Sequence, residues 1–172
     1  ILRSLGKLQE AELSTRKAIK LNPNYENAYL NLGPILKDLG KLQEAELSTR
    51  KAIELNPNSA ESHLNLGTIL RDLGNLEDAE LSTRKAIRLN PDDAIAYSNL
   101  GNILRSLGNL EEAESSTRKA IKLKANFTEA YSNLGTILKE LGKLQEAKFF
   151  YCKAIKLNPY SKNVYWNLSL LE

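Results

Sequence analysis

Apolar residues recur along this chain at intervals of three and four positions, the spacing that places them on one side of a helix. In the first complete unit, Glu26 to Ser59, we expect a helix of roughly 13 residues that ends at Gly40. Its apolar side consists of Ala28, Leu32, Ile35, Leu36 and Leu39. A second helix is expected from Leu42 to Leu55, closed by Pro57. The pattern therefore predicts two amphipathic helices joined by a tight turn.

The same pattern returns every 34 residues, and the nine glycines mark the period most clearly. One series consists of Gly33, Gly67, Gly101 and Gly135, and the other of Gly6, Gly40, Gly74, Gly108 and Gly142. We interpret the first series as close helix crossings and the second as left-handed helix ends. The complete units are 26–59, 60–93, 94–127 and 128–161, between partial units at 1–25 and 162–172. Because no hairpin buries its apolar face alone, the repetition predicts a single all-α solenoid of stacked antiparallel helix-turn-helix repeats.

The residues of the repeat also resemble a known family. The strings Tyr97-x-x-Leu100-Gly101, Leu107-Gly108-x-Leu110-x-x-Ala113 and Ala120-Ile121-x-Leu123 resemble the tetratricopeptide repeat, over essentially the whole chain. The resemblance implies a right-handed superhelix whose first helices line the concave surface and whose second helices form the outside. The chain departs from the family where tyrosine or phenylalanine is usual, since it has Thr15, Thr49, Thr83 and Thr117 there, and only Tyr151 follows the pattern.

Composition and charge exclude several other classes. With 42% hydrophobic residues and five prolines, the chain is too apolar for a disordered protein. It has no run of about 18 apolar residues, so we expect a soluble protein without a membrane partner, cytoplasmic by default. The formal net charge of +3 is small, and base-stacking aromatic residues do not recur, so we expect no nucleic-acid partner.

The residues of a catalytic or metal centre are missing from the sequence. The chain has one histidine, His63, one cysteine, Cys152, and no phosphate-binding glycine loop. We therefore predict no enzyme activity, no metal site and no cofactor in this segment. The chain lacks methionine and begins and ends inside repeats, so we expect it to be a fragment of a longer protein. The alternative function is therefore substrate recruitment for a larger glycosyltransferase-like or other modifying enzyme.

One asparagine stands at the same point of each predicted first helix. The row consists of Asn31, Asn65, Asn99, Asn133 and Asn167. An amide both donates and accepts hydrogen bonds, so a row of amides suits the backbone of an extended peptide. It resembles the asparagine ladder in the tetratricopeptide superhelix of O-linked N-acetylglucosamine transferases, which holds protein substrates in this way. The alternative is hydrogen bonding between repeats that sets the superhelix pitch.

Positions beside this row differ between units, whereas the second helices are nearly constant. We predict that the variable positions read peptide side chains: Glu61, Leu64, Thr68 and Asn102. A basic row also crosses the first helices, formed by Arg3, Lys37, Arg71, Arg105 and Lys139. Acidic neighbours interrupt it, so the row is explained either by an acidic ligand or by ion pairs between repeats. We expect the least neutralised stretch around Arg105.

The last predicted helix is apolar and no later unit in this chain covers it; its apolar residues are Tyr165, Trp166, Leu168, Leu170 and Leu171. Unmatched ends of a solenoid remain apolar. We therefore expect this end either to meet further repeats or to support end-to-end self-association. The main expectation for partners remains a protein or peptide on the first helices.

Overall fold

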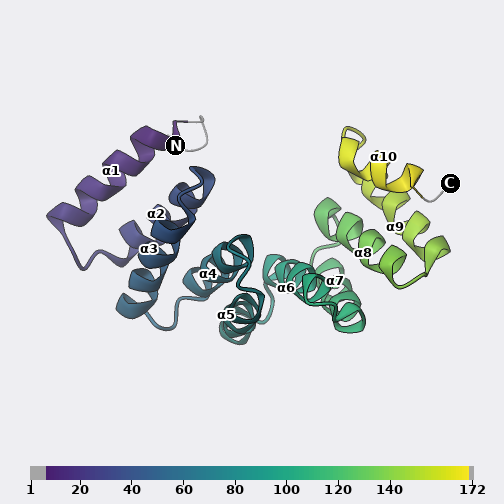
Figure 1. Ribbon diagram of the computed structural model, residues 1–172, viewed down its shortest axis with the longest axis horizontal. Coiled ribbons are helices and arrows are strands. Elements are labelled where there is room, and N and C mark those ends of the chain that lie inside the picture. The colour runs from purple at the N-terminus through teal and green to yellow at the C-terminus, as the bar shows by residue number, and fades with distance from the viewer. Residues whose placement is uncertain (1–6, 171–172) are drawn as a thin grey trace. The chain divides into compact units, whose positions relative to one another are not determined.

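The computed structural model describes residues 7–170, so Arg3 and the expected helix end at Gly6 lie outside the described residues. Short helices follow one another along this range (Figure 1). Their bounds are α1 Leu8–Leu21, α2 Glu26–Asp38, α3 Leu42–Leu55, α4 Ala60–Asp72, α5 Leu76–Leu89, α6 Ala94–Ser106, α7 Leu110–Leu123, α8 Thr128–Glu140, α9 Leu144–Leu157 and α10 Lys162–Ser169. The predicted helix Leu42–Leu55 is confirmed at both ends.

The chain forms two compact units, with the boundary between Pro91 and Asp92. In the first unit, α2 packs on α3 and α4 packs on α5, and α1 covers the outer side of α2 (Figure 1). In the second unit, α6 packs on α7, α8 packs on α9, and α10 closes against α9. The first helices of neighbouring hairpins also meet, α2 with α4 and α6 with α8. Each unit is therefore a stack of helical hairpins, as the repetition predicts.

The two glycine series have the two roles that the sequence indicates. Gly40, Gly74, Gly108 and Gly142 have φ between 75° and 84°, a conformation that side chains other than glycine's rarely adopt. At the first of these turns, Lys41 N–H donates to Leu36 O at 2.9 Å, which completes the helix end. Gly33 instead lies against Thr49 of α3, and a Cβ at Gly33 would overlap the threonine Oγ1. The glycine therefore sets how closely α2 and α3 approach.

Small and branched apolar side chains fill the space between the helices of each hairpin. In the first unit, Leu32, Leu36, Ala45 and Ile69 form one buried cluster. In the second unit, Leu134, Leu138, Tyr151 and Val164 belong to a larger cluster. Pro34 lies inside α2, which nevertheless continues to Asp38. The cores leave one side of the first helices accessible, which is the side that carries the asparagine row.

Candidate functional site

The predicted asparagine row lies on the first helices of both units. Asn31 and Asn65 belong to α2 and α4 of the first unit, and Asn99, Asn133 and Asn167 to α6, α8 and α10 of the second. Asn31 is exposed and the other four are half-buried. The residue after each asparagine is a leucine that packs inward, for example Leu32 and Leu134. The helix period therefore holds each amide at the edge of the core, within reach of solvent.

One amide of the row joins two neighbouring hairpins. Asn133 Nδ2 of α8 donates to Ser98 Oγ of α6 at 3.3 Å. An inter-repeat role, which the sequence left open, therefore exists at this position. An asparagine side chain has two N–H donors and a carbonyl acceptor. This single bond leaves most of the hydrogen-bonding capacity of Asn133 for other groups.

A polar hollow of about 440 Å³ adjoins Asn133 in the second unit. Glu129, Ser132 and Asn133 of α8 line it on one side, and Asn163 of α10 lines it on another. The loop before α10 adds Asn158 and Ser161, which the sequence did not indicate as site residues. Helical periodicity carries no information about loop residues. The hollow therefore brings polar side chains of α8 and α10 together with those of the loop before α10.

The predicted side-chain-reading positions are accessible in the structure. Glu61 of α4 is exposed, whereas Leu64 and Thr68 of α4 and Asn102 of α6 are half-buried. Thr68 Oγ1 donates to Leu64 O at 3.1 Å, within its own helix. These side chains are placed where a ligand can reach them, and a role in binding stays a prediction.

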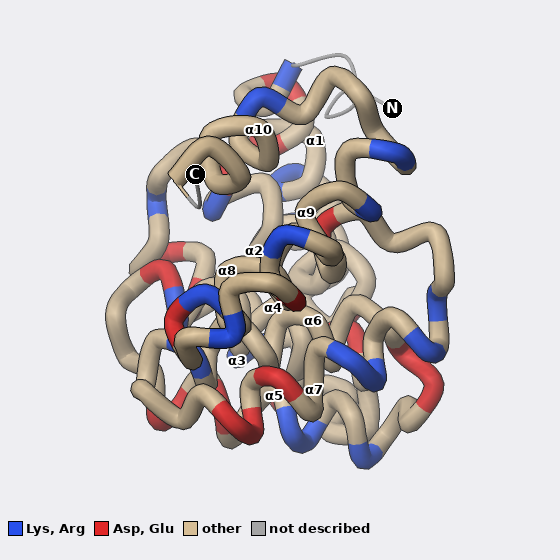
Figure 2. Tube along the Cα trace, turned by 90° about the vertical axis from the view of Figure 1, so that its right-hand side faces the viewer, with Lys and Arg blue, Asp and Glu red and all other residues tan. Residues whose placement is uncertain are grey.

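The basic row is largely neutralised by neighbouring carboxylates, and Figure 2 shows both signs of charge interspersed along the chain. Lys37 Nζ lies 3.8 Å from Asp72 of the next first helix, and Arg71 pairs with Asp72 at 2.7 Å. Arg105 Nη1 lies 2.8 Å from Glu140 of α8. The expectation that the row is least neutralised around Arg105 is therefore wrong, because a carboxylate one repeat later reaches it. Lys139, also in this row, is half-buried.

The second helices carry a separate set of ion pairs that link one hairpin to the next. Glu114 of α7 accepts from Arg118 in its own helix and from Lys143 just before α9, both at 2.8 Å. Burial raises the pKa of Glu114, but these hydrogen bonds outweigh it and leave the pKa below its usual value. In the first unit, hydrogen bonds from Lys41 and then Arg16 likewise lower the pKa of Glu12. These ion pairs connect neighbouring hairpins through the second helices, which do not carry the asparagine row.

Between residues 7 and 170, no group of three or more His, Cys, Asp and Glu side chains is placed to hold a metal ion. Over that range, none of the helices combines the length and the apolar character needed to cross a bilayer. His63 is half-buried, with Nε2 3.0 Å from Pro57 O. The geometry thus offers accessible amides and a polar hollow as its main surface chemistry.

Solved structures similar to this chain include two that are described as TPR proteins. MamA is 29% identical, with a TM-score of 0.79 and 92% of each chain covered. A thermophilic TPR protein of Thermus thermophilus is 24% identical, with a TM-score of 0.83 over 99% of this chain and 93% of that one. YrrB, described as a TPR protein with an unusual peptide-binding site, is 24% identical, with a TM-score of 0.73 over 91% and 81%.

Sequence profiles match nearly the whole length of the chain. The tetratricopeptide repeat profiles match residues 30–94, 64–126 and 128–161, and a TPR repeat profile matches residues 1–40. A search of curated proteins found no match. The matched profiles cover far more than half of the chain, and the structure shows the paired helices and the glycine contacts that the repeat requires. The chain therefore belongs to the tetratricopeptide repeat family.

Proposed function

We propose that this chain is a non-catalytic scaffold for protein–protein interaction, which holds an extended peptide against its first helices through the asparagine row. The proposal is carried by one observation: an amide accessible to solvent recurs at the same point of each first helix. Packed helices lie about 8–10 Å apart, and an extended chain rises about 3.3 Å per residue. Amides on neighbouring first helices would therefore meet peptide groups about three residues apart.

The second unit offers the most complete surface for such a peptide. The hollow of about 440 Å³ beside Asn133 has polar walls, including Ser132 and Asn163. Peptide N–H and C=O groups lose hydrogen bonds to water when they bind, so polar walls are needed to replace them. Asn133 can contribute to both roles, because its bond to Ser98 uses only one of its donors.

The basic row is expected to add little to the selection of ligands. Lys37, Arg71 and Arg105 already have carboxylate partners, and exposed ion pairs contribute weakly to binding energy. Recognition would therefore depend on the amides, with preference added by variable positions such as Glu61 and Leu64. Such a surface binds many sequences with modest differences in affinity.

The test is a peptide array probed with the unchanged chain and with N99A/N133A/N167A. Each lost amide bond removes about 0.5–1.5 kcal/mol, so the triple variant should bind at least about tenfold more weakly. The matched control is N75A/N90A/N109A, because these three asparagines are exposed and lie outside the row. Equal binding by the row variant and the unchanged chain would refute the proposal.

Ser98→Ala separates peptide binding from the role between repeats. It removes the partner of Asn133 but keeps the amide, so it should bind peptides normally. If the row served only to join hairpins, S98A and N133A would both lower the free energy of unfolding. In that case N133A would leave peptide affinity unchanged.

A further inference from the structure

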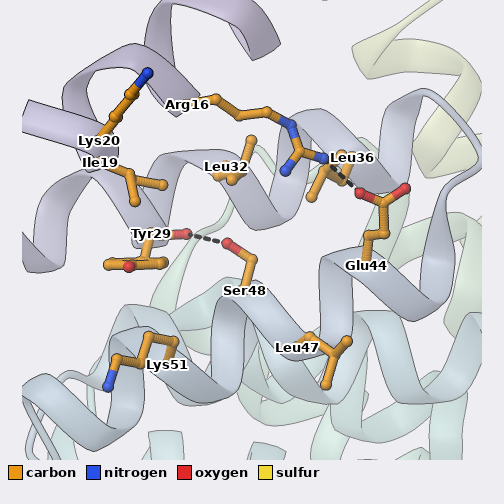
Figure 3. Close-up of a pocket in the computed structure, with 10 residues that line it drawn as sticks. All are labelled: Arg16, Ile19, Lys20, Tyr29, Leu32, Leu36, Glu44, Leu47, Ser48 and Lys51. Atoms are coloured by element: carbon orange, nitrogen blue, oxygen red, sulfur yellow. Dashed lines mark hydrogen bonds and ion pairs between the residues drawn. The ribbon is translucent and has the colours of Figure 1, made fainter. Parts of the chain in front are cut away.

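The first unit has a second cavity, on the side where α1 and α3 pass over α2 (Figure 3). Its volume is about 400 Å³, and its lining is mainly apolar. Leu32 and Leu36 of α2 are buried beneath it, and Ser48 of α3, only 8% exposed, lies at its base. Ser48 Oγ donates to Tyr29 O at 3.3 Å. The cavity is separate from the asparagine row and from the polar hollow of the second unit.

The chain contains a second copy of this cavity wall 102 residues later, where α7 and α9 pass over α8. At eight of the ten lining positions the two copies have the same residue, including Arg16 and Arg118, and Tyr29 and Tyr131. The other two positions change Leu47 to Phe149 and Ser48 to Phe150. These two copies therefore have the same wall with serine at the base in α3 and phenylalanine in α9.

In the second unit, the ring of Phe150 occupies this place. It stacks on Tyr131 with 6.1 Å between ring centroids, and the Arg118 guanidinium lies 5.2 Å from its centroid. It also packs against the buried cluster that contains Leu134 and Leu138. Arg118 bridges to Glu146 at 2.9 Å, just as Arg16 bridges to Glu44 in the first unit. The surroundings of Phe150 thus show which kind of group these walls accept.

Charge around the cavity limits the occupant further. Arg16, Lys20 and Lys51 line its mouth together with one carboxylate, Glu44 (Figure 3). Arg16 pairs with Glu12 as well as Glu44, and Lys51 pairs with Glu54 at 2.7 Å, so the remaining positive charge at the mouth is that of Lys20. We propose that the cavity between α1 and α3 accepts an aromatic side chain from an acidic segment of a partner protein. The ring would stack on Tyr29 beneath Arg16, and the acidic neighbours of the ring would face Lys20 and Lys51.

A second copy of this chain fits the cavity less well. Tyr160 is its most exposed large apolar side chain among the described residues, at 90%, but it stands two positions before Lys162. Insertion of Tyr160 would therefore bring a lysine toward a basic mouth. An acidic partner supplies the opposite charge, which also speeds association at low salt.

The proposal is tested with the capped peptide Asp-Glu-Asp-Phe-Asp-Glu-Asp, titrated against the whole chain. Fluorescence anisotropy gives the affinity, and amide NMR shifts at Ser48 and Tyr29 locate the site. Replacement of the peptide's phenylalanine by alanine should weaken binding by about tenfold or more, because burial of the ring is lost. Equal affinity of the two peptides would overturn the proposal.

Two protein variants test the cavity itself. S48F should abolish binding and keep or raise the melting temperature, because the same side chain fits at Phe150. Its matched control, S82F, places phenylalanine at the same point of α5 and should leave binding unchanged. If S48F disturbs the fold, K20E/K51E serves as the second test. It reverses the charge of two lysines at the mouth of the cavity and should weaken peptide binding severalfold. Unchanged affinity in K20E/K51E and a retained site in S48F each contradict the proposal.

Phe150→Ser should create a second site, because it leaves the other walls in place. Calorimetry should then give two peptides per chain instead of one. The asparagine variant N99A/N133A/N167A should bind this peptide normally, which separates this proposal from the function proposed above. If that variant loses the peptide, or if S48F abolishes self-association in sedimentation, the cavity has a different role and the proposal is wrong.

Discussion

The hairpins α2–α3 and α8–α9 share one backbone plan but fill the space between their helices differently. In α2–α3, Thr49 packs on Gly33, and its Oγ1 donates to Ala45 O at 2.8 Å. In α8–α9, the ring of Tyr151 takes that place against Gly135. Both side chains are fully buried. A small hydroxyl side chain and a large ring can therefore both pack against the glycine at this helix crossing.

This difference shows that the backbone of the repeat tolerates different interior volumes. The tyrosine hydroxyl lies 3.1 Å from Thr136 Oγ1, and burial raises the pKa of Tyr151. The preceding residue differs as well, since Phe150 stands where the first unit has Ser48. In the ring-filled hairpin Phe150 packs on Tyr131 and the buried cluster, whereas the serine-containing hairpin has a cavity of about 400 Å³. The cavity is thus found where the chain has the small side chain of Ser48 in place of the ring of Phe150.

Tyr151→Thr would convert the second hairpin toward the first and should have the largest effect. Removal of a buried ring without a compensating group lowers the free energy of unfolding by about 3 kcal/mol or more. Hydrogen exchange of α9 amides, compared with α3 amides, would locate the loss. The control Y151F keeps the ring and removes only the hydroxyl contact with Thr136, so it should lose about 1 kcal/mol. Similar losses in the two variants would mean that the ring is not what stabilises α8–α9.

Pro34→Thr would make α2 more like α8, which has Thr136 at the equivalent position. Proline inside a helix removes a backbone hydrogen bond and clashes with the preceding turn. We expect P34T to raise the free energy of unfolding by about 2 kcal/mol. Urea unfolding would measure the gain, with loop proline Pro57→Ala as the control that shows none. A gain no larger than that of P57A would show that α2 accommodates its proline without strain.

Glu12→Gln and Glu114→Gln test the ion pairs between hairpins, which are present in both units. Both glutamates have a pKa below the ordinary value of 4.5 in the folded chain. Each therefore stabilises the fold above the pKa of the unfolded chain, and this contribution is lost as the pH falls through the lowered value. Each variant should lose less than about 1 kcal/mol at pH 7 and nothing near pH 2. Urea unfolding at pH 7 and pH 2 would measure the loss in the free energy of unfolding. Unequal losses in the two variants would show that the two ion clusters differ.

Local features were largely predictable because they depend on residues close in sequence. The bounds of α3 follow from helical periodicity and Pro57, and the positive φ at Gly40 follows from its place after a helix. Contacts between repeats were harder to predict. Arg105 meets Glu140 across 35 residues, and Arg16 meets Glu44 across 28. Which carboxylate reaches which cation depends on how the hairpins stack.

The sequence by itself determined the repeat, the helix pairs, the glycine crossings and the recurrence of an asparagine on each first helix. These properties follow from periodicity and from the conformational freedom of glycine, so they need no knowledge of neighbouring repeats. Only the tertiary structure decided that Asn133 bonds to Ser98, that Arg105 is neutralised, and that serine in α3 leaves a cavity where Phe150 packs in α9. Packing of one hairpin on the next places these side chains, because the positions that meet there lie about one repeat or more apart in sequence.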